Sequence, residues 1–108
     1  MNIKHLAPIA LLAGCAGSSA GLYERQPAVV LQSQREPMDL SACIATALIG
    51  APSVIQVGAD HYAILRKNGY GMPLVRYDVF KRDGSTSVEI RNNPQIGSTA
   101  LDKVSACL

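Results

Sequence analysis

Few residues of this sequence have side chains that could take part in acid–base or nucleophilic chemistry. Beyond the first fifteen residues the only histidine is His61, which follows an acid in the run Asp60-His61-Tyr62. Neighbouring residues of a strand point to opposite faces of a sheet, so this run does not predict an acid–base pair. We expect His61 to be a solvated residue at the edge of a turn, and a small hydrolase using His61 is the enzymatic hypothesis.

Other residue types found in catalytic sites lack the spacing that their chemistry requires. Ser85, Ser87 and Ser98 fall in turn, strand and loop contexts, without the Gly-x-Ser-x-Gly pattern of a nucleophile elbow. The Gly-Tyr-Gly run at 69–71 lacks the lysine and the following helix of a phosphate-binding loop. We therefore predict that the protein is not an enzyme and has no cofactor.

Cysteine is the remaining reactive residue type, with three copies, at positions 15, 43 and 107. Cys43 and Cys107 stand 64 positions apart, with His61 as the nearest further ligand, and this is not zinc-ligand spacing. No metal site is expected. An odd number of cysteines in an exported chain needs an explanation.

The first fifteen residues have the three-part layout of a secretory signal. Lys4 supplies positive charge, residues 6–13 are apolar, and Gly14-Cys15 follows. About nine apolar residues at roughly 1.5 Å each cover under half of a bilayer core that is about 30 Å thick. We therefore do not expect this run to span a membrane.

The run Leu12-Ala13-Gly14-Cys15 resembles the lipobox of bacterial lipoproteins. The resemblance covers only the first fifteen residues. It implies that Leu12, Ala13 and Gly14 are recognised by a dedicated signal peptidase, which removes residues 1–14. It also implies that Cys15 carries a diacylglyceryl group and, in Gram-negative organisms, a further acyl chain such as palmitate. Partners implied in this way are the lipoprotein maturation and sorting machinery and a membrane, because two or more acyl chains give stable anchoring.

The residue after the lipidated cysteine indicates the destination of such lipoproteins. In the Gram-negative family an aspartate there favours the inner membrane, so Ala16 implies the cell outer membrane, with the domain facing the periplasm. Two alternatives stay open. One is an ordinary apolar N-terminal helix with an incidental cysteine, and the other is conventional cleavage near Ala20.

Lipidation of Cys15 would explain the odd cysteine count. It leaves Cys43 and Cys107 in an oxidising compartment, where a disulfide between them is favoured. The bridge would close a loop of 65 residues. Loss of chain entropy in the unfolded state would then stabilise the fold by about 4 kcal/mol. Two separate buried thiols are the alternative.

The chain of 108 residues is long enough for one domain. Small and polar residues over 15–27 predict a flexible tether after the lipidated cysteine, and the folded domain is expected over 28–108. Residues 28–31 are interpreted as either a short strand or an extended arm on that domain.

Two helices are predicted. Apolar residues at helical spacing indicate a helix over 37–49: Leu40, Cys43, Ile44, Ala47 and Leu48. A second, short helix is expected from about Ser98 or Thr99 to Cys107. Both cysteines then lie on apolar helix faces.

Strand patterns occupy the region between the helices, over 54–57, 61–66, 74–82 and 85–91. Asp83-Gly84 is a strong two-residue hairpin signal. It pairs positions whose numbers sum to 167, which puts Tyr77 opposite Ile90 and gives one apolar face.

The predicted fold class is α+β. It consists of a three- to four-stranded antiparallel meander with both helices packed on its apolar face and joined by Cys43–Cys107. The other sheet face is expected to be polar and wet. Its polar side chains include the direct like-charge pairs Arg76/Arg91 and Asp78/Glu89, which the diagonals Arg76–Glu89 and Asp78–Arg91 offset.

Composition limits the function to a few classes. A formal charge of +2 and few aromatic residues give no case for nucleic-acid binding. Arg66-Lys67 and Lys81-Arg82 lie near strand ends, where charge is typical of solvation and edge protection.

Phe80, apolar on the polar face, is interpreted as an isolated exposed aromatic or as covered by the N-terminal arm. A minority hypothesis makes Phe80 and Tyr70 partner contacts.

The leading functional hypothesis is a non-enzymatic binding or assembly-accessory module, anchored in the envelope and directed at an unknown envelope protein. The alternative is a protective inhibitor of a secreted enzyme such as a lysozyme.

Overall fold

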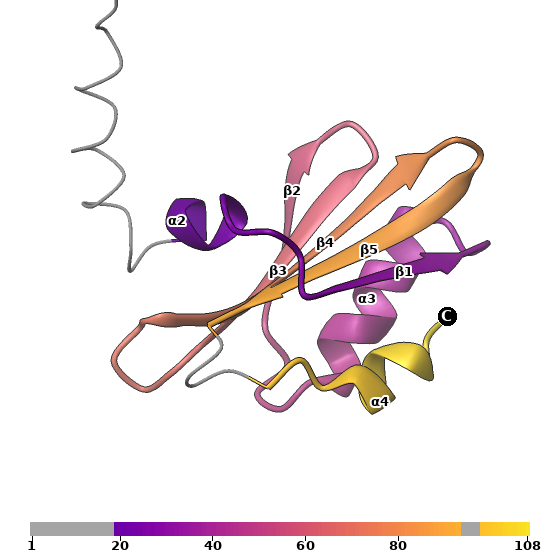
Figure 1. Cartoon of the computed structure of the whole chain (residues 1–108). Helices are drawn as coiled ribbons and strands as arrows, with labels where there is room; N and C mark the ends of the chain where they lie inside the picture. The colour runs from indigo at the N-terminus through magenta and orange to yellow at the C-terminus, as the bar shows by residue number, and fades with distance from the viewer. Residues whose placement is uncertain (1–18, 94–97) are drawn as a thin grey trace, which may run out of the picture.

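The computed structural model describes residues 19–93 and 98–108, which form a five-stranded antiparallel sheet with short helices (Figure 1). The elements in chain order are α2 (Ser19–Tyr23), β1 (Val29–Ser33), α3 (Pro37–Ala47), β2 (Val54–Gly58), β3 (His61–Lys67), β4 (Pro73–Arg82), β5 (Ser85–Asn92) and α4 (Leu101–Ser105). The strand order across the sheet is β1-β5-β4-β3-β2. The α+β class is therefore confirmed.

The predicted number of strands, three or four, is wrong, because β1 is a fifth strand. It pairs antiparallel with β5, with Val29 opposite Ile90 and Leu31 opposite Val88. Val29 and Leu31 pack against the core while Val30 points away from it and is exposed. This alternation makes residues 29–33 a strand rather than a loosely packed arm.

The β4–β5 hairpin has the predicted register. Tyr77 lies opposite Ile90 and Val79 opposite Val88, and Asp83 and Gly84 both have positive φ angles, of 53° and 83°. Positive φ at both central residues is what a type I′ turn requires. The turn and the apolar alternation thus specify the same pairing.

Both predicted helices are present, although each is shorter than predicted, and α3 and α4 pack on the same apolar sheet face (Figure 1). Leu40 and Ile44 of α3 and Val104 of α4 are completely buried together with sheet residues. Those sheet residues are Ile64, Val75, Tyr77, Val79, Val88 and Ile90. The disulfide Cys43–Cys107 joins α3 to the segment after α4. The prediction that it joins two helices is therefore wrong, because α4 ends at Ser105, two residues before Cys107.

The opposite sheet face is not wet as predicted. Asp78 and Ser87 are completely buried, and Arg91 is nearly so. The covering element is α2, which packs on β4 and β5 and buries Leu22. Residues 19–23 lie in the segment that composition predicts to be a tether. They are helical because the sheet provides a surface for Leu22 and Tyr23.

Tyr77 is a buried phenol on the helix-covered face. Its hydroxyl donates to the carbonyl oxygen of Thr99 at 3.0 Å and accepts from Arg66 Nη1 at 3.2 Å. Burial raises the pKa of the Tyr77 phenol above its ordinary value, and the hydrogen bond and charge of Arg66 oppose that rise.

This shift predicts a loss of stability in alkali. Above about pH 10 the unfolded chain releases the Tyr77 proton while the folded chain retains it. The unfolding free energy should therefore fall with rising pH until the folded pKa is passed. Tyr77→Phe should show a shallower fall between about pH 9 and pH 11 in urea titrations. Tyr70→Phe is the matched control, because Tyr70 is 97% exposed. If the unfolding free energy fell equally steeply with pH in wild type and Tyr77→Phe, the loss of stability in alkali would not come from Tyr77.

Candidate functional site

The predicted lipidation site lies outside the described residues. Cys15 and the recognition residues Leu12, Ala13 and Gly14 all precede Ser19, where the description of the structure begins. The predicted signal peptide over 1–14 and the first part of the tether fall outside it as well.

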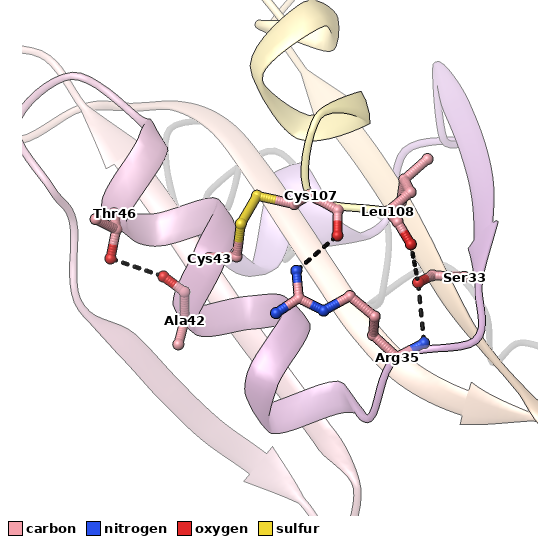
Figure 2. Close-up of a disulfide and its surroundings, with 7 residues drawn as sticks. All are labelled: Ser33, Arg35, Ala42, Cys43, Thr46, Cys107 and Leu108. Carbon is pink, nitrogen blue, oxygen red and sulfur yellow. Dashed lines mark hydrogen bonds between the residues drawn. A yellow bond between two sulfur atoms is a disulfide. The ribbon is translucent and has the colours of Figure 1, made fainter.

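The predicted disulfide is present, and a network of backbone acceptors surrounds it (Figure 2). Arg35 Nη1 donates to the carbonyl oxygen of Cys107 at 2.8 Å, and Ser33 Oγ donates to that of Leu108 at 3.0 Å. Thr86 Oγ1 donates to the carbonyl oxygen of Arg35 at 2.6 Å. Ser33 at the end of β1 and Arg35 after it therefore bind residues 107–108 in addition to the disulfide.

The two residues suggested as partner contacts lie in different places. Tyr70 is in the turn between β3 and β4, which extends from one end of the sheet (Figure 1). Phe80 lies seven positions beyond the start of β4, a rise of about 23 Å. Its ring is 5.3 Å from that of His61, and the Arg82 guanidinium lies 4.9 Å above it. The structure therefore does not bring Tyr70 and Phe80 into one patch.

A cluster of charged side chains occupies the α2-covered face, centred on the carboxylate of Asp78. Arg76 binds it through Nε, 2.9 Å from Oδ2, and through Nη2, 3.0 Å from Oδ1. Arg91 Nη1 lies 3.5 Å from Oδ2, which is the diagonal contact expected from the hairpin register. Because Asp78 is completely buried, these cations take the place of solvent around its charge.

Tyr23 of α2 covers this cluster. The guanidinium carbon of Arg76 lies 4.3 Å from the centre of the Tyr23 ring, and that of Arg91 lies 4.8 Å from it. Arg91 Nε also donates to the carbonyl oxygen of Arg25 at 2.8 Å. Planar guanidinium groups stack readily on aromatic rings, so the two arginines bind both the buried carboxylate and α2.

His61 belongs to the same cluster and is not a solvated edge residue as predicted. Its Nε2 lies 2.8 Å from Asp78 Oδ1, and the side chain is 26% exposed. The contact is a diagonal one, since β3 pairs Ala63 with Asp78 and His61 with Phe80. Sequence reasoning missed this contact because the long connection between β3 and β4 does not specify their register.

A histidine bound to a carboxylate could serve as an acid or base if a nucleophile stood beside it. Ser87 shares this sheet face, but Phe80 lies between it and His61 across the strands. Two strand spacings separate the two residues by about 10 Å. Ser87 Oγ lies 3.3 Å from Gln32 Oε1 instead. The cluster therefore holds charges and α2 in place without forming a Ser–His–Asp relay.

Several apolar side chains are exposed along β2, which the sequence pattern predicts only as a short apolar strand. All five residues of β2 are exposed, and its one neighbour in the sheet is β3. Val54 shares the helix-covered face with Ile64, whereas Ile55 shares the opposite face with Ala63. A groove of about 560 Å³ begins at Ile55 and is bordered by the α3–β2 connection.

Comparisons with known proteins add no assignment: no protein-family model, curated protein or solved structure matches this chain. Within residues 19–93 and 98–108, no helix is both long and apolar enough to cross a membrane. In the same residues no cluster of three or more metal-ligating side chains occurs.

Proposed function

We propose that the protein is a lipid-anchored lipoprotein of the bacterial envelope whose small domain binds another envelope component. The anchor is a di- or triacylated Cys15, and the domain faces the periplasm from the outer membrane. Its role is that of a non-enzymatic binding or assembly-accessory module.

The observation that carries the proposal is the distribution of the three cysteines. Cys43 and Cys107 form a disulfide, which leaves Cys15 as the one cysteine outside the bridge. A disulfide of this kind is typical of proteins in oxidising compartments outside the cytoplasm. The remaining cysteine stands in the run Leu12-Ala13-Gly14-Cys15, which resembles a lipobox.

The position of α2 determines how the anchored domain would be held. Four positions separate Cys15 from Ser19, the first residue of α2. Four extended residues reach at most about 14 Å. A lipidated Cys15 would therefore keep the α2-covered face of the domain close to the bilayer, and the tether would be shorter than composition predicts.

Intact-mass spectrometry of the membrane-extracted protein tests the anchor. We expect the loss of residues 1–14, a mass gain equal to two or three acyl chains with their glyceryl group, and the loss of two hydrogens for the disulfide. Cys15→Ala should abolish both cleavage and acylation. A soluble protein that retains Met1 and titrates three thiols would refute the proposal.

The proposed location at the outer membrane is tested by a pair of substitutions at Ala16. By resemblance to Gram-negative lipoproteins, Ala16→Asp should move the protein from the outer to the inner membrane fraction on density-gradient separation. Ala16→Ser is the control and should leave the distribution unchanged. If both variants fractionate like the wild type, outer-membrane sorting by residue 16 is refuted, while anchoring itself is still judged by the mass.

A second function, protective inhibition of a secreted enzyme such as a lysozyme, is favoured by the β3–β4 turn. Tyr70 at this turn is 97% exposed. The backbone around it is held by Asn68, whose Oδ1 accepts from the N–H of Tyr70 at 2.9 Å and of Met72 at 3.0 Å. A rigid turn that presents an aromatic side chain loses little conformational entropy on entering a cleft.

The inhibitor hypothesis predicts near-stoichiometric inhibition by the purified protein within a panel of secreted lysozymes and proteases. Tyr70→Ala should weaken inhibition by about tenfold or more, as expected for an interface hot spot. Phe80→Ala is the comparison variant and should retain inhibition. The absence of inhibition across the panel would remove this hypothesis.

A further inference from the structure

We propose that the edge of β2, together with the groove beside it, binds an extended acidic peptide segment of the partner by strand addition. This inference rests on the proposed function, since it specifies the surface and the partner chemistry of the binding module. Three observations support it: the exposure of β2, the position and apolar lining of the groove, and the positive charge of the groove's rim.

The two edges of the sheet differ in how they are protected. At the β1 edge, Ser33 is buried and donates to the carbonyl oxygen of Leu108, and Arg35 binds Cys107. At the β2 edge no residue is buried, and Val54, Ile55 and Val57 are among the exposed large apolar side chains. The strand Val-Ile-Gln-Val-Gly contains none of the charges or prolines that usually block pairing at an edge.

An added strand would find only a short stretch of regular edge. The register between β2 and β3 shifts between Gln56 and Gly58, so the regular part is Val54–Gln56. Main-chain hydrogen bonds along three residues give little affinity by themselves. Strand-adding peptides obtain the remainder from side chains that fill pockets next to the edge.

The groove supplies such a pocket where β2 begins. β3 continues beyond its last pairing with β2, at Ile64, as far as Lys67, and the groove lies along this extension. Its apolar lining includes Ile49, Ile55, Leu65 and Leu74. Ile49 is 81% exposed, so a bound side chain would cover apolar surface that now meets water.

The rim of the groove determines the charge of the occupant. Arg66 and Lys67 line it, and no acidic residue does so among the described residues. Arg66 Nη1 binds the Tyr77 hydroxyl and, at 2.8 Å, the carbonyl oxygen of Ser98, which are both neutral acceptors. Neither cation forms an ion pair within the described part of the chain. A carboxylate on the incoming segment would therefore be favoured.

Selection from a phage-displayed library of random heptapeptides on the purified full-length protein tests this proposal. We expect enriched peptides to alternate β-branched residues and to carry Asp or Glu near one end. Ile55→Lys should lower the affinity of the best synthetic peptide by about tenfold or more. Val30→Lys is the matched control, since Val30 is 50% exposed on the β1 edge, and it should bind normally.

Two further measurements distinguish strand addition by an acidic peptide from other ways of occupying the β2 edge. Lys67→Glu should remove the charge preference, because the new carboxylate offsets Arg66 on the rim, so that a peptide with Gln in place of its acid binds as well as the original. Hydrogen exchange should slow at amides within 54–57 when the acidic peptide is bound. Enrichment that is equal on wild type and Ile55→Lys would overturn the proposal. So would a concentration-dependent dimer that Ile55→Lys abolishes, because the occupant of the edge would then be a second copy of this chain.

Failure here is distinguishable from failure of the proposed function. Panning reports on the domain whatever its N-terminus carries, whereas intact mass reports on cleavage, acylation and the disulfide. Absent peptide binding with a correctly acylated Cys15 would refute only the strand-addition site.

Discussion

Replacing Asp78 by alanine should destabilise the domain by about 3–5 kcal/mol, which is the usual cost of removing one partner from a buried ion pair. The side chains of Arg76 and Arg91 are only 12% and 10% exposed, and both face the Asp78 carboxylate. Without it, the two guanidinium groups would be held close together without the carboxylate that both face, while Glu89 already binds Arg91 at 2.9 Å. Urea denaturation followed by far-UV circular dichroism measures the loss.

The matched control is Glu36→Ala. It breaks an ion pair of similar length, in which Lys81 Nζ lies 3.1 Å from Glu36 Oε2, but the two side chains are 36% and 67% exposed. Such surface pairs contribute about 0–1 kcal/mol. If Asp78→Ala costs no more than Glu36→Ala, the cluster does not stabilise the fold as its geometry indicates.

Removing the disulfide should have an effect of similar size. The double variant Cys43→Ala/Cys107→Ala frees two residues that are 64 positions apart. Chain-entropy arguments for a loop of that length give a loss of about 4 kcal/mol, compared with about 5–15 kcal/mol for the whole stability of a typical domain. We expect a large decrease in the urea midpoint and partial unfolding at 37 °C.

Reductant provides the control for this experiment. Wild-type protein in a phosphine reductant should shift to the midpoint of the double variant, whereas the double variant itself should not respond. Arg35 and Ser33 still bind the carbonyl oxygens of Cys107 and Leu108, so α4 retains part of its attachment. An unchanged wild-type midpoint under full reduction would show that these contacts alone hold the C-terminal segment.

Local signals in the sequence predicted the parts of the fold that depend on nearby residues. The β4–β5 register follows from Asp83-Gly84 and from apolar residues at every second position. The helix Pro37–Ala47 follows from apolar spacing and from a proline in its first turn. The disulfide was predicted from the number of cysteines and the expected compartment, because the resemblance of residues 12–15 to a lipobox leaves two cysteines to pair.

Parts that depend on distant residues could not be predicted in this way. β1 is a strand because Val29 pairs with Ile90, and four apolar residues read alone fit either a strand or an arm. α2 forms where Tyr23 meets Arg76 and Arg91, far along the chain. One signal was present: direct like-charge pairs on a supposedly wet face indicate that another element or charge compensates them.

The amino-acid sequence by itself determined the α+β class, the hairpin register, the cysteine pairing and the expectation of a lipid anchor, because each depends on residue types at short spacing or on counting. Only the tertiary structure decided that α2 covers a buried charge cluster, that His61 binds Asp78, and that β2 is left as an unprotected edge. These features arise from which strands become neighbours and which surfaces remain uncovered. That outcome depends on the packing of the whole domain, and no local pattern specifies it.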